Sequence, residues 1–151
     1  MITESSLHKM VFKKRVLIDT NIIIYLTDMV QPYASLSRRL FEMVEEGNAF
    51  AVFSIISIAE VMQGPLRKGD VGNAKDLSDY LFNFPNSCFQ EINAEVLGRI
   101  GMGRKIEWPK LRVVDSLIIA SGLEMDVDLF VSNDKHFKKA MPNDLILTFD
   151  V

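Results

Sequence analysis

Four acidic residues of the chain stand beside apolar segments, where a folded core would fix the position of each side chain. They are Asp19, Glu60, Asp115 and Asp134. Ionised carboxylates within ~4–6 Å of one another disfavour each other's charge, so a gathered set needs shared protons or a bound cation. Oxygen ligands without Cys or His favour Mg²⁺ or Mn²⁺, and carboxylate-held Mg²⁺ commonly serves phosphate-ester chemistry. If the four side chains meet, they predict metal-assisted cleavage of phosphate esters.

Each of these acids also has an ordinary structural explanation. Asp19 and Asp134 follow apolar runs and could cap helices. Glu60 could complete a capping box with Ser57, and Asp115 could interact with a helix dipole. For any one acid alone, the structural explanation is the better one, since short motifs often match by chance. The placement of all four relative to the predicted strands favours a shared site instead.

Short apolar runs alternate along the chain with segments of helical spacing. We expect strands at residues 15–18, 49–54, 89–92, 128–131 and 145–148. We expect helices at residues 22–26, 32–47, 57–64, 70–82, 93–100, 113–125 and 135–140. This alternation predicts an α/β domain with a largely parallel sheet covered on both faces. Ligands of such sheets bind beyond the carboxyl ends of the strands, where the acids fall.

The length of 151 residues suits a single domain with its own core. We expect an N-terminal tail over residues 1–12 and one domain over 13–151, because the first residues are polar and lack periodicity. Cys88 is the one cysteine, which excludes an intramolecular disulfide and a cysteine-based zinc site. With neither a secretory signal nor a membrane-length apolar run, we expect a cytoplasmic protein without a membrane partner.

The net charge of −3 gives no bulk electrostatic sign of nucleic-acid binding. The chain has 17 basic and 20 acidic residues, and without the four candidate acids 16 acidic residues remain, so the rest carries +1. An RNA substrate is therefore compatible with the composition.

Basic residues gather in sequence near two of the acids. Those we expect to contact RNA phosphates are Arg104, Lys105, Lys110, Arg112 and Lys135. The alternative is a solvated charged face. Trp108 lies in the same stretch, and packing against Pro109 is favoured over stacking on a base. His136 is expected to be a surface residue.

Four segments resemble the PIN domain family, and specifically the small VapC-type ribonuclease toxins of toxin–antitoxin pairs. They are VLIDTN at 16–21, SIISIAEVMQG at 54–64, VDSLIIA at 114–120 and FVSNDKHF at 130–137. The segments occur in the family's order, and the similarity spans about residues 14–148. The resemblance implies a three-layer α/β/α domain with a central, mainly parallel sheet of about five short strands.

The resemblance also implies a Mg²⁺- or Mn²⁺-dependent endoribonuclease. Its implied catalytic and metal-binding residues are Asp19, Glu60, Asp115 and Asp134, with Asn21 and Ser132 orienting carboxylates through hydrogen bonds. The bound metal would activate a water that attacks phosphorus in line. Either Glu60 or Asp134 would orient that water, and the metal count and the RNA target stay open.

The resemblance further implies a homodimer and a cognate antitoxin. A candidate docking surface combines residues 22–26 with the 36–44 helix face, unless both are ordinary core. Three alternatives remain open: a processing ribonuclease without an antitoxin, a non-catalytic PIN-like module that binds RNA or protein, and a Mg²⁺-dependent phosphohydrolase of small esters. A common phosphohydrolase pattern needs a second Asp where this chain has Asn21.

Overall fold

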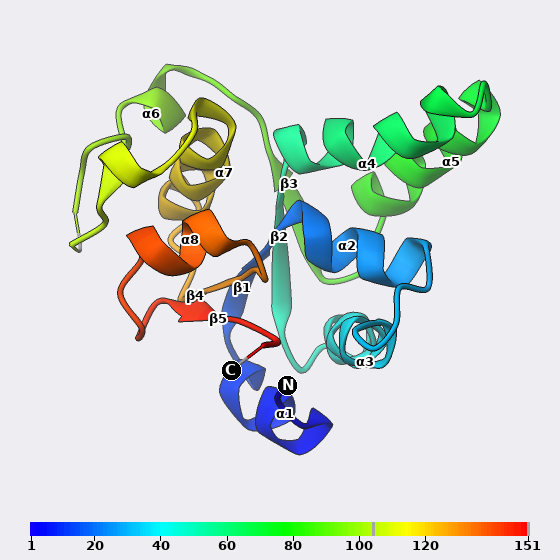
Figure 1. The fold of residues 1–151 in the computed structure, drawn as a ribbon, viewed down its shortest axis with the longest axis horizontal. Coiled ribbons are helices and arrows are strands. Elements are labelled where there is room, and N and C mark those ends of the chain that lie inside the picture. Colours follow the sequence, from blue (N-terminus) through cyan, green and yellow to red (C-terminus); the bar gives the residue numbers. More distant parts are fainter. Residues whose placement is uncertain (104, 151) are drawn as a thin grey trace.

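A parallel five-stranded sheet runs through the centre of the computed structural model, which describes residues 1–103 and 105–150 (Figure 1). The strands are β1 (Arg15–Ile18), β2 (Phe50–Ser54), β3 (Ser87–Gln90), β4 (Leu129–Val131) and β5 (Ile146–Leu147). Their order is β3-β2-β1-β4-β5, and all four pairings are parallel. The chain order reverses beside β1, and this kind of switch point is where α/β sheets bind ligands.

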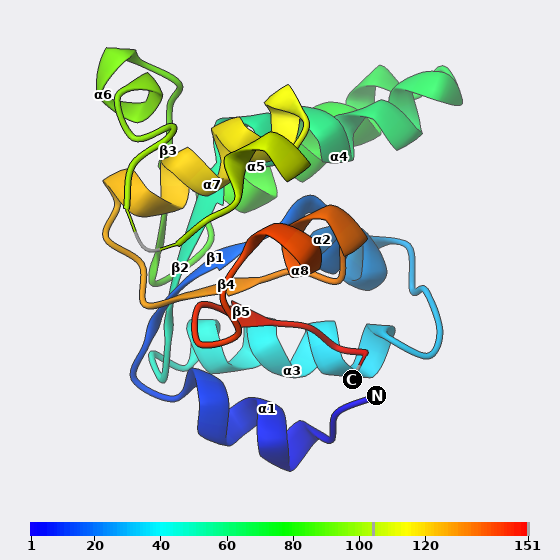
Figure 2. The same cartoon turned by 60° about the vertical axis from the view of Figure 1, so that its left-hand side comes forward.

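Helices cover both faces of the sheet, as the predicted α/β/α fold requires. They are α1 (Glu4–Val11), α2 (Thr20–Thr27), α3 (Ala34–Glu45), α4 (Ile55–Arg67), α5 (Val71–Phe82), α6 (Ala94–Leu97), α7 (Val113–Glu124) and α8 (Lys135–Ala140), with a 3₁₀ turn at Trp108–Lys110. Val16 and Ile18 of β1 face a core formed with α1, α2 and α3, whereas Leu17 faces a second core with α7 and α8. This alternation along a strand gives the three layers seen in Figure 2.

The prediction of a tail over residues 1–12 is wrong, because residues 4–11 form α1. Leu7 and Val11 are fully buried against the core that contains α3, and the Ile2 amide donates a hydrogen bond to the Phe149 carbonyl at 2.8 Å. The Thr3 hydroxyl caps the helix by accepting from the Ser6 amide. Two buried apolar residues four apart are a weak helical signal. The remaining, mostly polar residues of the segment therefore made it resemble a tail.

Two strands pass directly into helices, and this corrects one predicted helix start. The Ser54 side chain accepts a hydrogen bond from the Ile56 amide, so α4 begins at Ile55 and not at Ser57. Glu60 therefore lies in the second turn of α4, and the expected capping box with Ser57 does not form. Strand β1 likewise passes through Asp19 into α2. Such junctions fix the first side chains of a helix relative to the sheet.

Part of the candidate docking surface for an antitoxin is interior. Ile22 and Ile23 of α2 and Leu36, Leu40 and Val44 of α3 are at most 2% exposed. The two helices pack against each other and against the sheet, so these five residues form core. Ile24, Tyr25 and Leu26 are only partly buried, so the prediction is corrected for the buried residues alone. Among the described residues, no helix is both long and apolar enough to cross a membrane.

Candidate functional site

A cavity of about 150 Å³ opens at the carboxyl edge of the sheet, beside the switch point. Its lining residues are Asp19, Thr20, Asn21, Ile24, Glu60, Arg112, Asp115, Ile118 and Asp134. All four predicted acids therefore meet in one place, although they come from β1, α4, α7 and the turn after β4. We call this cavity the acid pocket.

Asp19 is one of two acids of the acid pocket that are buried, together with Asp115. It caps α2, with Oδ1 accepting from the Thr20 amide at 2.8 Å and Oδ2 accepting from the Ser132 hydroxyl at 2.6 Å. Burial raises the pKa of Asp19 to about 7, and the charges of Asp134 and Glu60 add to the rise while the two hydrogen bonds oppose it. A nearby cation would stabilise its ionised form.

Glu60 is oriented by a residue that the sequence analysis did not select. The Thr20 hydroxyl donates a hydrogen bond to Glu60 Oε1 at 2.6 Å and also lies 3.0 Å from the Ser57 hydroxyl. Thr20 is the first residue of α2, so the junction that places Asp19 also places this donor. Its position directly after the first acid, in the run Asp19-Thr20-Asn21, is the signal that could have identified it.

Arg112 forms ion pairs with two of the acids inside the acid pocket. Its Nε donates to Asp115 Oδ2 at 2.9 Å and its Nη2 to Asp115 Oδ1 at 3.0 Å. The same Nη2 lies 3.4 Å from Asp134 Oδ2. The hydrogen bonds and charge of Asp115 raise the pKa of Arg112 above its ordinary value. Arg112 was expected to contact phosphate, and its contact with the acids was not foreseen.

The turn after β4 holds Asp134 through several hydrogen bonds. Ser132 Oγ accepts from the Asp134 amide at 3.1 Å, and Asp134 Oδ1 accepts from the His136 amide at the start of α8. Asn21 Oδ1 accepts from the Asn133 amide at 3.2 Å. Ser132 thus bonds a carboxylate as expected, whereas Asn21 bonds the backbone of the turn that carries Asp134. The exposed His136 ring lies 3.1 Å from Asp134 Oδ1.

The acid pocket offers suitable ligands for a divalent cation without holding them ready in one cluster. Four carboxylates and no sulfur form the all-oxygen donor set that Mg²⁺ or Mn²⁺ takes. Within residues 1–103 and 105–150, however, no three Asp, Glu, His or Cys side chains are close enough to hold a metal ion. Two of the acids contact Arg112 instead. The chemistry of the lining residues therefore suits a divalent cation, although the described side chains do not form a ready cluster of ligands.

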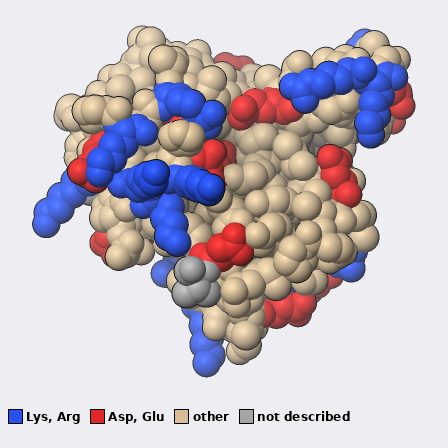
Figure 3. Space-filling view, in the orientation of Figure 1, with Lys and Arg blue, Asp and Glu red and all other residues tan. Residues whose placement is uncertain are grey.

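The lining of the acid pocket does not include Lys105, Lys110 or Lys135, which were also expected to contact phosphate. Lys135 is exposed at the start of α8, Lys105 is exposed, and Lys110 is paired with Glu107 at 2.9 Å. Arg104 lies outside the described residues. Figure 3 shows Lys and Arg side chains gathered over α8 next to acidic side chains. Of these lysines, Lys135 directly follows Asp134, an acid that lines the pocket.

Trp108 packs against the second core, as expected. It is partly buried against the group that includes Ile106 and Phe137, and its indole Nε1 is buried without a hydrogen-bond partner among the described residues. Packing therefore accounts for this side chain. Stacking on a base would need it to leave that contact.

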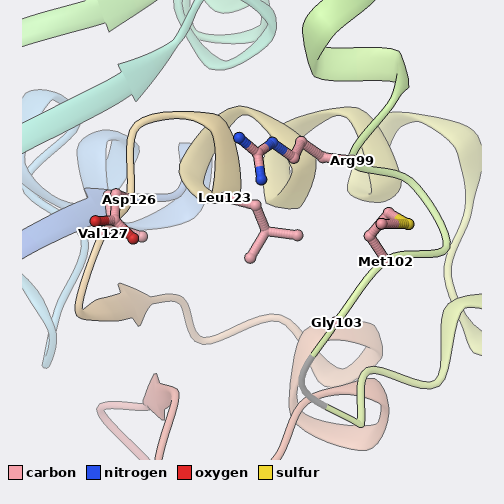
Figure 4. Close-up of a pocket in the computed structure, with 6 residues that line it drawn as sticks. All are labelled: Arg99, Met102, Gly103, Leu123, Asp126 and Val127. Atoms are coloured by element: carbon pink, nitrogen blue, oxygen red, sulfur yellow. The ribbon is translucent and has the colours of Figure 1, made fainter.

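A second cavity, of about 170 Å³, lies at the other end of α7 (Figure 4). Arg99, Leu123 and Val127 contribute to its lining, and the Arg99 guanidinium is paired with Glu124 at 3.1 Å. Its single lining carboxylate belongs to Asp126. This cavity lacks the paired carboxylates of the acid pocket, so it is the weaker candidate for hydrolytic chemistry.

Comparison with known families and structures gives one consistent picture. The family model of the PIN domain matches residues 16–141. A search of curated proteins finds no match. Similar solved structures include VapBC2 from Rickettsia felis bound to a promoter DNA fragment (19% identity, TM-score 0.64, covering 90% of this chain and 99% of that one).

Two further structures share the fold. One is a toxin–antitoxin complex from Klebsiella pneumoniae, with 19% identity, a TM-score of 0.60 and coverage of 88% of this chain and 96% of that one. The other is the sarcin–ricin loop cleaving toxin VapC20 from Mycobacterium tuberculosis, with 13% identity, a TM-score of 0.62 and coverage of 82% and 93%. At these identities the likeness establishes the arrangement of elements.

Proposed function

Because the chain belongs to the PIN domain family, we propose that it is a metal-dependent endoribonuclease and the toxin of a VapBC-type toxin–antitoxin pair. The observation that carries this proposal is the acid pocket, where four carboxylates from distant parts of the chain line one cavity at the switch point of the sheet. The structural neighbours support it, since they include VapBC2 from Rickettsia felis, a toxin–antitoxin complex and a sarcin–ricin loop cleaving toxin.

The carboxylates of Asp19, Glu60, Asp115 and Asp134 would hold a Mg²⁺ or Mn²⁺ ion. Such an ion would lower the pKa of a bound water and would compensate the negative charge on the phosphate. Asp19 is fixed by Ser132 and by the Thr20 amide, so its oxygens are directed without loop motion. Proteins tune metal sites through such supporting hydrogen bonds.

Glu60 is the better candidate for orienting the attacking water. The Oε1 atom of Glu60 accepts a hydrogen bond from the Thr20 hydroxyl. Glu60 lies on α4, whereas the two acids that pair with Arg112, Asp115 and Asp134, lie on other parts of the chain. Asp134 is held by the His136 amide and by Arg112, which leaves its oxygens more fully engaged. A general base needs hydrogen-bond reach to the water and an acceptor oxygen.

Exposed basic side chains beside the acid pocket support RNA as the substrate. Lys135 directly follows Asp134 and is exposed, and Arg112 lines the pocket itself. Contacts of this kind bind phosphates without regard to sequence, so they favour a polymer over a small ester. We also propose that the protein acts in the cytoplasm, forms a homodimer and binds a cognate antitoxin. Asn21, at the position where a common phosphohydrolase pattern has a second Asp, is engaged with the Asn133 amide.

Cleavage of a structured RNA by the purified protein tests the proposal. We expect cleavage with Mn²⁺ or Mg²⁺, loss of cleavage in excess EDTA, and recovery when the metal is restored. Asp19→Asn should slow cleavage on the order of a hundredfold or more, because it removes a buried ligand charge. Asp76→Asn, which removes an exposed charge on α5, is the matched control and should cleave like the parent.

Two results would contradict the proposal. Cleavage that persists in EDTA, or Asp19→Asn at the parental rate, would exclude the acid pocket as the metal-dependent site. Absence of Mn²⁺ binding in a calorimetric titration would favour a non-catalytic PIN-like module instead. Co-purification with the product of an adjacent small reading frame tests the antitoxin part separately.

A further inference from the structure

The acid pocket contains its own cation. Arg112 is the basic residue among those that line it, and its guanidinium engages both oxygens of Asp115 while reaching Asp134 at 3.4 Å. Asp115 is almost completely buried, with 4% of its side chain exposed, whereas 60% of the Arg112 side chain is exposed. A mobile, solvent-facing cation therefore neutralises a fixed, buried anion.

A divalent ion and this guanidinium would compete for the same oxygens. Bidentate pairing with Arg112 engages both oxygens of the Asp115 carboxylate. To bind a metal ion, Asp115 would have to offer one of these two oxygens to the ion. Two cations on one carboxylate also repel each other, and the repulsion is stronger in a partly buried pocket than in water.

We infer that Arg112 is a built-in counter-ion of Asp115 and Asp134, that it leaves these carboxylates when they take a divalent cation, and that its guanidinium then binds a phosphate of the RNA. This inference rests on the proposed function. It assigns Arg112 two successive partners, first carboxylates and then phosphate. The planar guanidinium forms bidentate contacts with either group.

The local structure allows this exchange without unfolding α7. The backbone amide of Arg112 donates to Asp115 Oδ2 at 3.1 Å, so the cap of α7 remains when the side chain leaves. Arg112 precedes the helix, and the exposed Val113 follows it, so solvent and not core surrounds the path of the guanidinium. Side chains of this exposure change rotamer rapidly.

A purely structural Arg112 would behave differently from a counter-ion. If it only stabilised α7, its removal would weaken folding and leave metal affinity unchanged or reduced. If it is displaced by metal, its removal must strengthen metal binding. If it then holds phosphate, the same removal must weaken RNA binding at saturating metal. The opposite signs of these two effects distinguish the exchange from a structural role.

The test compares Arg112→Gln with the parent by calorimetric titration of Mn²⁺ and by cleavage kinetics. We expect the Kd for Mn²⁺ to fall roughly tenfold, because one competing charge leaves the pocket. At saturating Mn²⁺ we expect KM for RNA to rise roughly tenfold, as for the loss of one charge-assisted phosphate contact. Arg112→Lys keeps the charge without the bidentate contact, so its Mn²⁺ affinity should fall between the two.

Arg99→Gln is the matched control. It removes the same charge and also breaks an ion pair to α7, with Glu124, away from the acid pocket. Its Mn²⁺ affinity should stay within about twofold of the parent, since an exposed ion pair contributes little at a distance. Thermal unfolding of each variant confirms that it is folded before the titration.

The outcomes separate this inference from the proposed function. If the parent binds Mn²⁺ and cleaves RNA but neither Arg112 variant binds Mn²⁺ more tightly, the inference is overturned and the function stands. If Mn²⁺ binds no variant and RNA is not cleaved, both are overturned. If Arg112→Gln binds Mn²⁺ more tightly and shows a raised KM, the inference is supported.

Discussion

Asp19 serves the fold and the acid pocket with the same two oxygens. It caps α2 through the Thr20 amide, accepts from Ser132 and contributes one of four charges to the cavity. A buried carboxylate with like charges nearby is costly to ionise, and here burial raises its pKa to about 7. Without metal, this side chain should therefore weaken the fold near neutral pH.

This cost predicts how stability depends on pH when metal is removed by EDTA. The pKa of Asp19 is about 7 in the folded state against 3.8 ordinarily, so between these values the folded state binds the extra proton. The free energy of unfolding should then decrease as pH rises from about 4 to about 7 and change little above, by on the order of 4 kcal/mol from this group. Below about 4 the contribution is fully retained.

Urea denaturation of the parent and of Asp19→Asn at several pH values checks this prediction. Asn cannot ionise, so the stability of the variant relative to the parent should improve as pH rises through that window. A difference between the two proteins that is independent of pH would contradict it. Added Mn²⁺ should stabilise the parent above about pH 7 and have a smaller effect on the variant.

Thr20 gives a second prediction at the same scale. Thr20→Val removes the hydroxyl that donates to Glu60 Oε1 at 2.6 Å and keeps the shape of the side chain. We expect cleavage to slow roughly tenfold, because loss of a supporting hydrogen bond lets a catalytic carboxylate reorient. Stability should change by only about 1 kcal/mol.

Thr27→Val at the other end of α2 is the control. Among the residues that the structure describes, its hydroxyl bonds to the Ile24 carbonyl and to Asp28, which are both local, so cleavage should stay at the parental rate. Thr20→Ser should restore most of the activity. An unchanged rate in Thr20→Val would show that Glu60 needs no such support.

The acids could be located from sequence because each follows an apolar run, and parallel strands bring such positions to one edge. Thr20 and Arg112 could not be assigned their contacts in that way. Thr20 meets Glu60 across 40 residues, and Arg112 meets Asp134 across 22 residues. Contacts of this kind depend on how α4, α7 and the turn after β4 are placed in space, and the sequence pattern does not specify that placement.

At the scale of elements, direct junctions between strands and helices position the site. Asp19 and Ser54 each end a strand and cap the next helix, so no loop separates the sheet from α2 or α4. The strands and most helices were predictable from apolar runs and helical spacing. Helix α1 was missed because its buried face has only Leu7 and Val11, and the start of α4 was misplaced because Ser54 and Ser57 are both plausible caps.

The packing of α7 on the sheet gives a prediction at this scale. A Cβ atom on Gly122 would lie 2.5 Å from Phe130 Cε2 and 3.0 Å from Leu17 Cδ1. Both neighbours are buried, so Gly122→Ala should destabilise the protein by about 1–3 kcal/mol through overpacking. Because α7 carries Asp115, cleavage should also slow.

Gly72→Ala in α5 is the matched control, measured by thermal or urea unfolding. Its Cβ would lie 3.7 Å from Asp70 Oδ1, an ordinary contact, and alanine favours the helix. Stability should rise by up to about 1 kcal/mol. Equal effects of the two substitutions would mean that α7 is not closely packed on the sheet at Gly122.

At the scale of the whole molecule, charge is separated although the net value is only −3. The acid pocket gathers negative charge, and basic side chains gather over α8 beside it. If an RNA strand binds across both regions, its phosphates contact Lys side chains and release the counter-ions that they held. The affinity for RNA should then decrease as the salt concentration rises.

Lys135→Gln tests this arrangement in RNA-binding titrations at several salt concentrations, using the cleavage-deficient Asp19→Asn background. If Lys135 contacts a phosphate, the slope of log K against log salt should become less negative by about 0.7, the value for one contact to a single strand. Lys68→Gln, after α4 and away from the acid pocket, should leave the slope unchanged. Identical slopes for both variants would exclude a Lys135–phosphate contact.

The pairing of β1 with β4 determines when, during translation, the acid pocket can form. Ser132 and Asp19 are hydrogen-bonded across 113 residues, and the turn that holds Asp134 follows β4. A nascent chain therefore carries Asp19 and Glu60 long before it can close the pocket. The four carboxylates can meet only after β4 and the turn that follows it have been synthesised, which is late in the translation of the chain.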